Sequence, residues 1–158
     1  MATPRTISDQ LALLLGQWFG CGLSPRAPGT IGSLGALPLF WVLSQQSLSV
    51  YWGTTILLSL GGFWVSERCS VLLQEKDPQR VVLDEVAGVL IALGFVLSSS
   101  FPILLLAWGL FRLFDITKPG LIDKVQHLKP NGVGIMADDL LAGLVAGLLA
   151  YGVQLLLP

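Results

Sequence analysis

The last apolar stretch of the chain constrains its fold most strongly. From Leu140 to Leu157 every residue is apolar or small except Gln154, which is about the length that an α-helix needs to cross the hydrocarbon core of a bilayer. Two carboxylates, Asp138 and Asp139, directly precede this stretch in the motif GIMADDLLAG. Carboxylates at a membrane boundary are costly, so they indicate a bound cation, basic partners or a water-filled site. The alternative is that both acids simply begin the helix, where its dipole favours negative charge.

Composition supports a membrane protein. Hydrophobic residues make up 53% of the 158 residues, charged residues 12%, and the mean hydropathy is +0.74, whereas soluble proteins carry roughly 25% charged residues. We therefore predict an all-α integral membrane protein that forms a single membrane-embedded domain. The net charge of -1 excludes the basic surface that nucleic-acid binding requires. Cys21 and Cys69 show no ligand-like spacing and are assigned no role.

The N-terminal segment reads as an interfacial helix. Residues Ile7 to Phe19 place a series of apolar side chains on one helical face, with Ser8 as the cap. The segment is too short and too polar at its start to span a bilayer, so we expect an amphipathic helix on the membrane surface. This helix and the loop after it make up residues 1–33 of the predicted domain, and a helical bundle makes up residues 34–158.

A turn-rich stretch follows, from Leu23 to Gly35, with the sequence LSPRAPGTIGSLG. Its prolines and glycines surround Arg26 and the hydroxyls of Thr30 and Ser33, which predicts an irregular loop able to cradle an anion. An ordinary connector is an equally good interpretation of these residue types. No Gly-Lys-Ser/Thr follows the glycines, so the stretch is not a Walker A loop.

The rest of the chain reads as about five short, partly spanning apolar helices. The expected segments are Leu34–Leu43, Val50–Val65, Val86–Leu97, Phe101–Phe111 and Leu140–Leu157. The links within the first and second hairpins carry no charge, so one crossing per segment places all nine Lys and Arg on the same side. By the positive-inside rule that side is the cytoplasm. We therefore expect a multi-pass membrane protein with its polar site at the cytoplasmic face.

Further charged motifs belong to that face. LDEVAG places Asp84 and Glu85 at the start of an apolar helix, as GIMADDLLAG does for its two acids. Two such pairs can direct oxygens at one or two hard cations.

FRLFDITKPG spaces Arg112, Asp115 and Lys118 three apart, close to one helical face. Arg and Lys can hold phosphate oxygens there. The alternative is an internal ion-pair network among these three residues.

Four or five carboxylates, a few cations and a single histidine point to one kind of chemistry. Oxygen ligands suit Mg²⁺, whereas zinc favours His or Cys. We expect His127 on a solvated or interfacial helix face, and no Gly-x-Ser-x-Gly elbow is present. The residues suit magnesium-assisted chemistry on a phosphate ester, in which a carboxylate orients water or acts as the nucleophile.

The four motifs, in this order and spacing, resemble the phosphatidylglycerophosphatase A family. They extend from Leu23 to Gly143, and one departure from the family pattern is Gly120-Leu121, where members usually have a second proline after Lys-Pro. The resemblance implies an inner-membrane, Mg²⁺-dependent phosphatase that converts phosphatidylglycerophosphate to phosphatidylglycerol. It also implies an acidic site with basic residues beside it. The site residues are Asp84, Glu85, Asp138 and Asp139 as metal ligands and catalytic groups, Asp115 as a further catalytic group, and Arg26, Thr30, Ser33, Arg112 and Lys118 as phosphate-binding groups.

Two other classes of membrane protein share some of these features. A small transporter would place carboxylates near the bilayer midplane, whereas here every acid is expected at one face. A lipid head-group phosphotransferase of the CDP-alcohol type would carry an Asp-Gly-x-x-Ala-Arg signature, which this sequence lacks. The sequence leaves open the oligomeric state, the number of metal ions and the choice between a metal-activated water and a carboxylate nucleophile.

Overall fold

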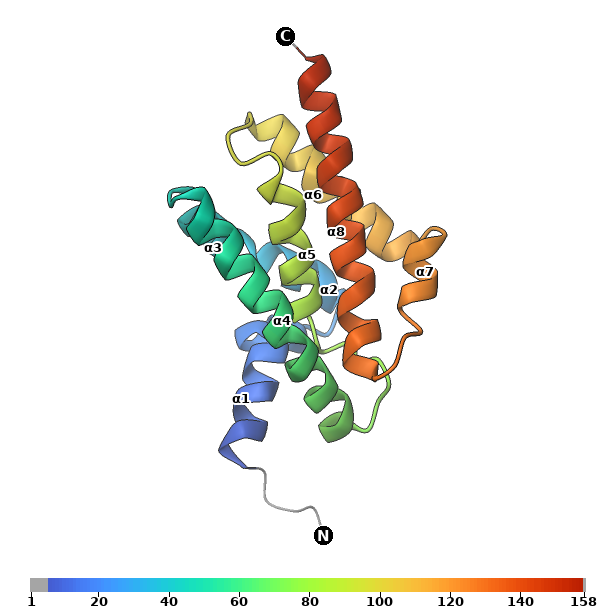
Figure 1. The fold of residues 1–158 in the computed structure, drawn as a ribbon. Helices are drawn as coiled ribbons and strands as arrows, with labels where there is room; N and C mark the ends of the chain where they lie inside the picture. Colours follow the sequence, from blue (N-terminus) through green and yellow to red (C-terminus); the bar gives the residue numbers. More distant parts are fainter. Residues whose placement is uncertain (1–5, 158) are drawn as a thin grey trace.

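A computed structural model describes residues 6–157, which form helices and no strands. This confirms the all-α prediction. The helices α1, α4, α5, α6 and α8 dominate the view in Figure 1. The elements are α1 (Ile7–Gly16), the 3₁₀ helix η1 (Trp18–Leu23), α2 (Pro28–Gly35), α3 (Leu37–Ser44), α4 (Leu48–Leu73), α5 (Leu83–Gly94), α6 (Phe101–Thr117), α7 (Leu121–Val125) and α8 (Asn131–Leu156). Arg5, one of the nine Lys and Arg in the charge prediction, lies outside the described residues.

Within the described residues, two helices are long and apolar enough to cross a membrane, namely α4 and α8, each of 26 residues. Helices α5 and α6 are shorter, with 12 and 17 residues, as the short apolar segments of the sequence predicted. The α3–α4 link, the α5–α6 link and the C-terminal end of α8 lie toward the upper end of Figure 1, and α1 lies at the lower end. The uncharged links therefore lie away from the end that holds α1.

Small residues let α8 pack closely on α5. A Cβ added at Gly143 would collide with the carbonyl oxygen of Gly88, and one added at Gly147 would collide with the ring of Phe95. Gly143 and Gly147 form a GxxxG pair, a spacing of small residues that allows two helices to approach closely. The side chains of Ala142, Ala146 and Ala150, on the same face, are fully buried.

Helix α8 begins nine residues earlier than predicted. Pro130 precedes its first turn, as proline often does at a helix start. Two residues of α4 bind this start: Glu67 Oε2 accepts from the backbone N–H of Gly132 at 2.6 Å, and Ser70 Oγ accepts from the side-chain amide of Asn131 at 2.9 Å. Helix α4 correspondingly runs past the predicted Val65. Asp138 and Asp139 therefore lie inside α8, and the interpretation that they begin the helix is wrong.

The prediction of an irregular loop from Leu23 to Gly35 is also wrong over most of that stretch. Its second half is helix α2, which begins with Pro28 at the first helical position. The glycines allow close packing in this helix, because a Cβ at Gly29 would collide with Glu85 and one at Gly32 with Val82. Backbone approach, rather than turn formation, explains these glycines.

The N-terminal helix ends at Gly16, three residues before the prediction, and its cap is Thr6, not Ser8. Thr6 and Asp9 form a reciprocal capping box. The backbone N–H of Thr6 and the guanidinium of Arg68 lower the pKa of Asp9, and Arg68 Nη2 lies 2.6 Å from Asp9 Oδ1.

The predicted apolar face of α1 lies on the outside of the molecule, where Ile7, Leu11 and Leu14 are exposed, while Ala12 and Leu13 are buried.

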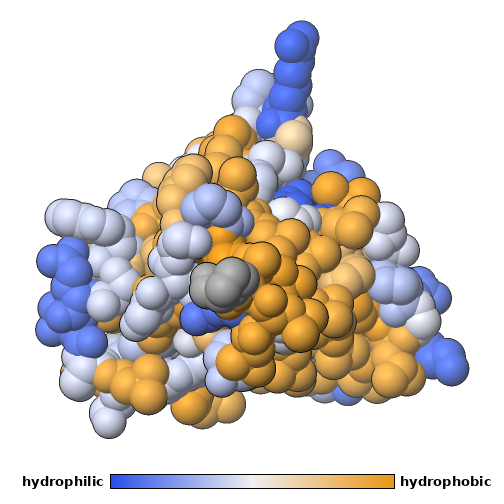
Figure 2. Space-filling model, turned by 90° about the horizontal axis from the view of Figure 1, so that it is seen from above, coloured by the Kyte–Doolittle hydropathy of each residue, from blue (hydrophilic) through white to orange (hydrophobic). Residues whose placement is uncertain are grey.

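The exposed surface of the molecule is apolar elsewhere too. Figure 2, seen from above, shows hydrophobic residues over a broad continuous area, with hydrophilic ones mainly at its margin. Exposed apolar area of this extent marks an interaction surface. Large apolar side chains that are more than half exposed include Leu57, Leu60, Trp64, Phe101, Leu105, Leu148 and Leu155.

Candidate functional site

Three carboxylates from two helices meet at the centre of the candidate site. Asp84 and Glu85 stand in the first turn of α5, and Asp139 comes from α8. One oxygen from each of the three lies within 4.8 Å of the others. The contact that allows this is close, because a Cβ at Gly88 would lie 2.7 Å from the carbonyl oxygen of Asp139. The three residues can together hold a metal ion.

The surroundings of this acidic cluster, Asp84, Glu85 and Asp139, leave it short of positive partners. Within residues 6–157, Asp84 Oδ1 and Glu85 Oε2 are buried and accept no hydrogen bond. Burial raises the pKa of Asp84 well above its usual range, helped by the charge of Glu85. Burial likewise raises the pKa of Glu85, to about 8. Buried carboxylates that crowd one another with open oxygens fit a hard cation such as Mg²⁺.

The fourth predicted acid, Asp138, is arranged differently. Lys118 Nζ forms an ion pair with Asp138 Oδ2, while Asp138 Oδ1 is buried without a hydrogen-bond partner in the described part of the chain. Lys118 is the C-cap of α6, in a left-handed conformation with φ of 43°. Burial alone would lower the pKa of Lys118, but the hydrogen bond and charge of Asp138 raise it to about 12. The predicted set of four acids is thus divided into a cluster of three and an ion-paired Asp138.

Arg112 links two helices at the side of the cluster. Its Nη1 forms an ion pair with Asp115, one turn later on α6. Its Nη2 donates to Thr30 Oγ1 on α2 at 3.3 Å, and its Nε is buried without a partner among residues 6–157. The ion pair that the sequence offered as an alternative is therefore present, with Asp115. The predicted third member, Lys118, bonds to Asp138 instead.

The remaining predicted phosphate-binding residues lie farther from the cluster or use their hydroxyls locally. Arg26 is exposed in the turn before α2, where its carbonyl accepts from Ser24 Oγ at 2.9 Å. Ser33 is fully buried, and its hydroxyl donates to the carbonyl of Thr30 at 2.9 Å. Neither side chain lines the cavity at the cluster.

That cavity has a volume of about 450 Å³ and brings the charged groups together. It also includes Asp77 and Gln79 from the α4–α5 link, which we did not predict. Both are exposed polar residues in a connecting segment, a pattern that carries no signal by itself. The charged lining residues are Asp77, Asp84, Glu85, Arg112, Asp115, Lys118, Asp138 and Asp139.

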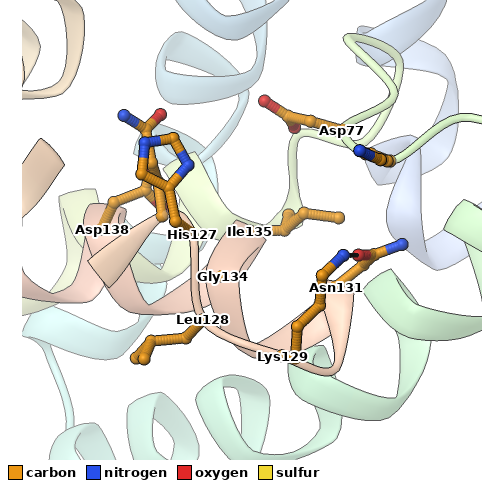
Figure 3. Close-up of a pocket in the computed structure, with 10 residues that line it drawn as sticks. Asp77, His127, Leu128, Lys129, Asn131, Gly134, Ile135 and Asp138 are labelled. Carbon is orange, nitrogen blue, oxygen red and sulfur yellow. Dashed lines mark hydrogen bonds between the residues drawn. The ribbon is translucent and has the colours of Figure 1, made fainter. Parts of the chain in front are cut away.

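A second cavity, of about 270 Å³, lies next to the first and shares Asp77, Ile135 and Asp138 with it. Figure 3 shows His127 and Lys129, from the link between α7 and α8, around this cavity with Asn131 at the start of α8. Lys129 Nζ donates to Asn131 Oδ1. His127 is exposed, as predicted, but it lies in this link and not on a helix face. The second cavity thus adds basic and amide groups beside the acidic cluster.

Comparison with known proteins identifies the family. The family described as phosphatidylglycerophosphatase A matches residues 14–154, a range that contains every predicted site residue. The chain belongs to this family. The prediction from the four motifs is confirmed, and the match supports a phosphatase over the transporter and phosphotransferase alternatives.

Three relatives cover most of the chain. Phosphatidylglycerophosphatase A of Haemophilus influenzae is 37% identical over 89% of this chain and 87% of its own length. The protein of the same name from Escherichia coli is 30% identical over 87% of this chain and 80% of its own length. A Bacteroides thetaiotaomicron protein, provisionally named a phosphatidylinositol-3-phosphatase, is 38% identical over 88% of this chain and 91% of its own length. No solved structure matches the chain.

Proposed function

We propose that this protein removes the terminal phosphate of phosphatidylglycerophosphate and so yields phosphatidylglycerol. The observation that carries the proposal is the acidic cluster with open oxygens, in one cavity with Arg112 and Lys118. This combination suits a phosphate monoester, because cations bind its oxygens and carboxylates hold a metal ion beside it. Family membership and the names of two relatives support the lipid substrate.

Mg²⁺ is the proposed cofactor, held by oxygens of Asp84, Glu85 and Asp139. When bound, the ion supplies a positive charge that offsets the negative charge of the phosphate in the transition state. The ligand set consists of carboxylates alone, and the cluster contains no soft sulfur or imidazole ligand.

The other residues have separate proposed roles. Arg112 turns from Asp115 toward the substrate and holds two phosphate oxygens with its planar fork, while Thr30 keeps the guanidinium at the cavity. Lys118 fixes Asp138, so that the open Oδ1 of Asp138 can accept a hydrogen bond from water. Arg26 is proposed to meet the lipid phosphate at the membrane surface, where its exposure leaves it free to move. Ser33 supports α2 through its bond to Thr30.

We further propose that the protein is embedded in the bacterial inner membrane with this site on the cytoplasmic side. The two long apolar helices and the uncharged links support this orientation. Cysteine labelling tests it: after replacement of Cys21 and Cys69, a cysteine at Ser99 should react with an impermeant reagent from the periplasm, and one at Lys124 should not. Reaction in the opposite pattern would invert the topology.

The decisive experiment is phosphate release by the purified protein in detergent. Phosphatidylglycerophosphate is compared with phosphatidylinositol 3-phosphate, because one relative is named for that lipid. We expect rapid release from phosphatidylglycerophosphate, loss of activity in excess EDTA and recovery with Mg²⁺. Full activity in EDTA would remove the metal from the mechanism. A clear preference for the phosphoinositide would replace the proposed substrate.

A further inference from the structure

We propose that a groove between α2/α3 and α6 binds one acyl chain of the lipid substrate. The inference rests on the proposed function, since it assumes that a phospholipid presents its head-group phosphate to the acidic cluster. It adds a second binding site, for hydrocarbon, with a defined place and direction. We call this site the α3–α6 groove, and its lining consists of Leu34, Leu37, Phe40, Trp41, Leu93, Phe101, Leu104, Leu105 and Trp108.

The groove arises from the way the helices diverge. Helix α6 packs mainly on α8 and α5, whereas α2 packs on η1 and α5, and α3 contacts α2 and α4. Little direct packing fills the space between α6 and the α2/α3 pair, which leaves a cavity of about 330 Å³. Its lining residues are apolar, and Trp41, Phe101 and Leu105 are more than half exposed at its edge. Such a space suits a hydrocarbon chain and offers little to a polar ligand.

One end of the groove lies close to the candidate site. Arg112 on α6 lines the cavity that holds the acidic cluster, and its Nη2 donates to Thr30 Oγ1 on α2. Leu34 lies one helical turn beyond Thr30, and Trp108 lies one turn from Arg112. These two residues line the groove, so the apolar lining begins about one turn from the proposed phosphate-binding arginine. A lipid with its phosphate at Arg112 would have its chain at Trp108.

The length of the groove fits one leaflet. Along α6 the lining runs from Trp108 to Phe101, which are seven residue steps apart and therefore about 10 Å apart along the helix. Half of a bilayer hydrocarbon core is about 15 Å thick. The groove can thus accommodate the part of an acyl chain nearest the head group, while the methyl end extends into the surrounding lipid.

A second apolar groove, which we call the α4–α8 groove, serves as the internal comparison. It has a volume of about 480 Å³ and is lined by residues of α4, α5 and α8, among them Phe63 and Leu144. Like the α3–α6 groove, it shares no residue with the cavity at the acidic cluster. Its two hydroxyls, on Thr55 and Ser59, donate to carbonyls of their own helix at 2.9 and 2.8 Å. None of its lining residues is charged, and Leu140, the lining residue next to the cluster in sequence, follows the acid Asp139 and not a basic residue.

Photo-crosslinking of the wild-type protein tests the assignment directly. The probe is phosphatidylglycerophosphate with a diazirine in the middle of one acyl chain, bound in detergent without turnover in excess EDTA. We expect adducts on the α3–α6 groove, between residues 34 and 41 and between residues 101 and 108. Adducts confined to the α4–α8 groove, or spread evenly over the apolar surface, would overturn the proposal.

Filling the groove gives an independent kinetic test. Leu105→Trp narrows it, and Leu148→Trp is the matched control on α8, because both leucines are about half exposed (53% and 51%) and only Leu105 lines the groove. For Leu105→Trp we expect kcat/KM on the two-chain lipid to fall at least tenfold, with activity on the deacylated head group unchanged. Equal behaviour of the two variants on the lipid would overturn the proposal, as would a change of oligomeric state for Leu105→Trp alone, which would identify the groove as a contact between copies.

The outcomes also separate this inference from the proposed function. If the wild-type protein hydrolyses neither the lipid nor its deacylated head group, the proposed function fails. If it hydrolyses both and Leu105→Trp behaves like Leu148→Trp, only the acyl-chain site fails.

Discussion

The two acidic pairs look alike in sequence and differ in the folded protein. Asp84 and Glu85 stand in the first turn of α5 and both join the acidic cluster. Asp138 and Asp139 lie within α8, and only Asp139 joins the cluster, while Asp138 pairs with Lys118. Neighbouring residues on a helix point about 100° apart. All four acids line one cavity, but α8 directs its two acids to different partners, whereas the first turn of α5 brings both of its acids into the cluster.

The largest expected effect separates the cluster from every other acid. Asp84→Asn and Asp139→Asn should each reduce kcat by roughly 10² or more, because each removes a charged ligand from the proposed metal site. Phosphate release measures the effect, and size-exclusion chromatography in detergent checks folding. The matched control is Asp123→Asn on α7, an exposed acid that accepts a hydrogen bond from Gln126 at 2.6 Å. A folded Asp139→Asn protein with near-normal turnover would contradict the assignment of Asp139 to the proposed metal site.

Arg112 tests whether the basic side of the cavity acts on substrate. Arg112→Lys keeps the charge but loses the two-point fork, so we expect kcat/KM to fall by about 10-fold to 100-fold if Arg112 holds phosphate. If Arg112 only neutralises Asp115, the double variant Arg112→Ala/Asp115→Ala should recover much of the activity that Arg112→Ala loses. Recovery in the double variant would assign Arg112 to the ion pair and remove it from substrate binding.

The contact between α5 and α8 allows Asp139 to reach the acids of α5, and it can be loosened. In Gly143→Ala the new methyl group would collide with the carbonyl of Gly88, so we expect a loss of about 1–3 kcal/mol in stability and a fall of a few-fold in activity. Gly152→Ala on the same helix is the control, since a Cβ there meets nothing within 4 Å. Thermal unfolding in detergent should show a lower Tm for Gly143→Ala alone. Equal Tm values would show that α8 can shift without cost.

The sequence predicted the parts of this molecule that depend on local residue type. The apolar helices were predicted from composition, and the family was predicted from the resemblance of the four motifs. The start of α8 was not, because Glu67 and Ser70, far away in the chain, bind its first turn. Helix α2 was not predicted for a related reason. Its glycines are typical of a loop, and only the close approach of Glu85 and Val82 in the folded protein explains them. Asp77 was not predicted as a cavity residue, because only the folding of the α4–α5 link brings it to the cavity.

A small effect on activity is also expected at Asp138, where the ion pair with Lys118 can be broken from either side. The side chain of Asp138 is almost fully buried (4% exposed), whereas that of Lys118 is 26% exposed. Removing the lysine leaves a buried charge without its partner, while removing the acid leaves an amine that can reach water. We therefore expect Lys118→Met to lower Tm more than Asp138→Asn, and the double variant to regain part of the loss. Asp138→Asn should cost about 10-fold or less in kcat, because the cluster of three stays intact. A loss of 10² or more, equal to that of Asp139→Asn, would place Asp138 among the metal ligands or nucleophiles, and the difference between the two pairs would then be one of geometry without a difference in role.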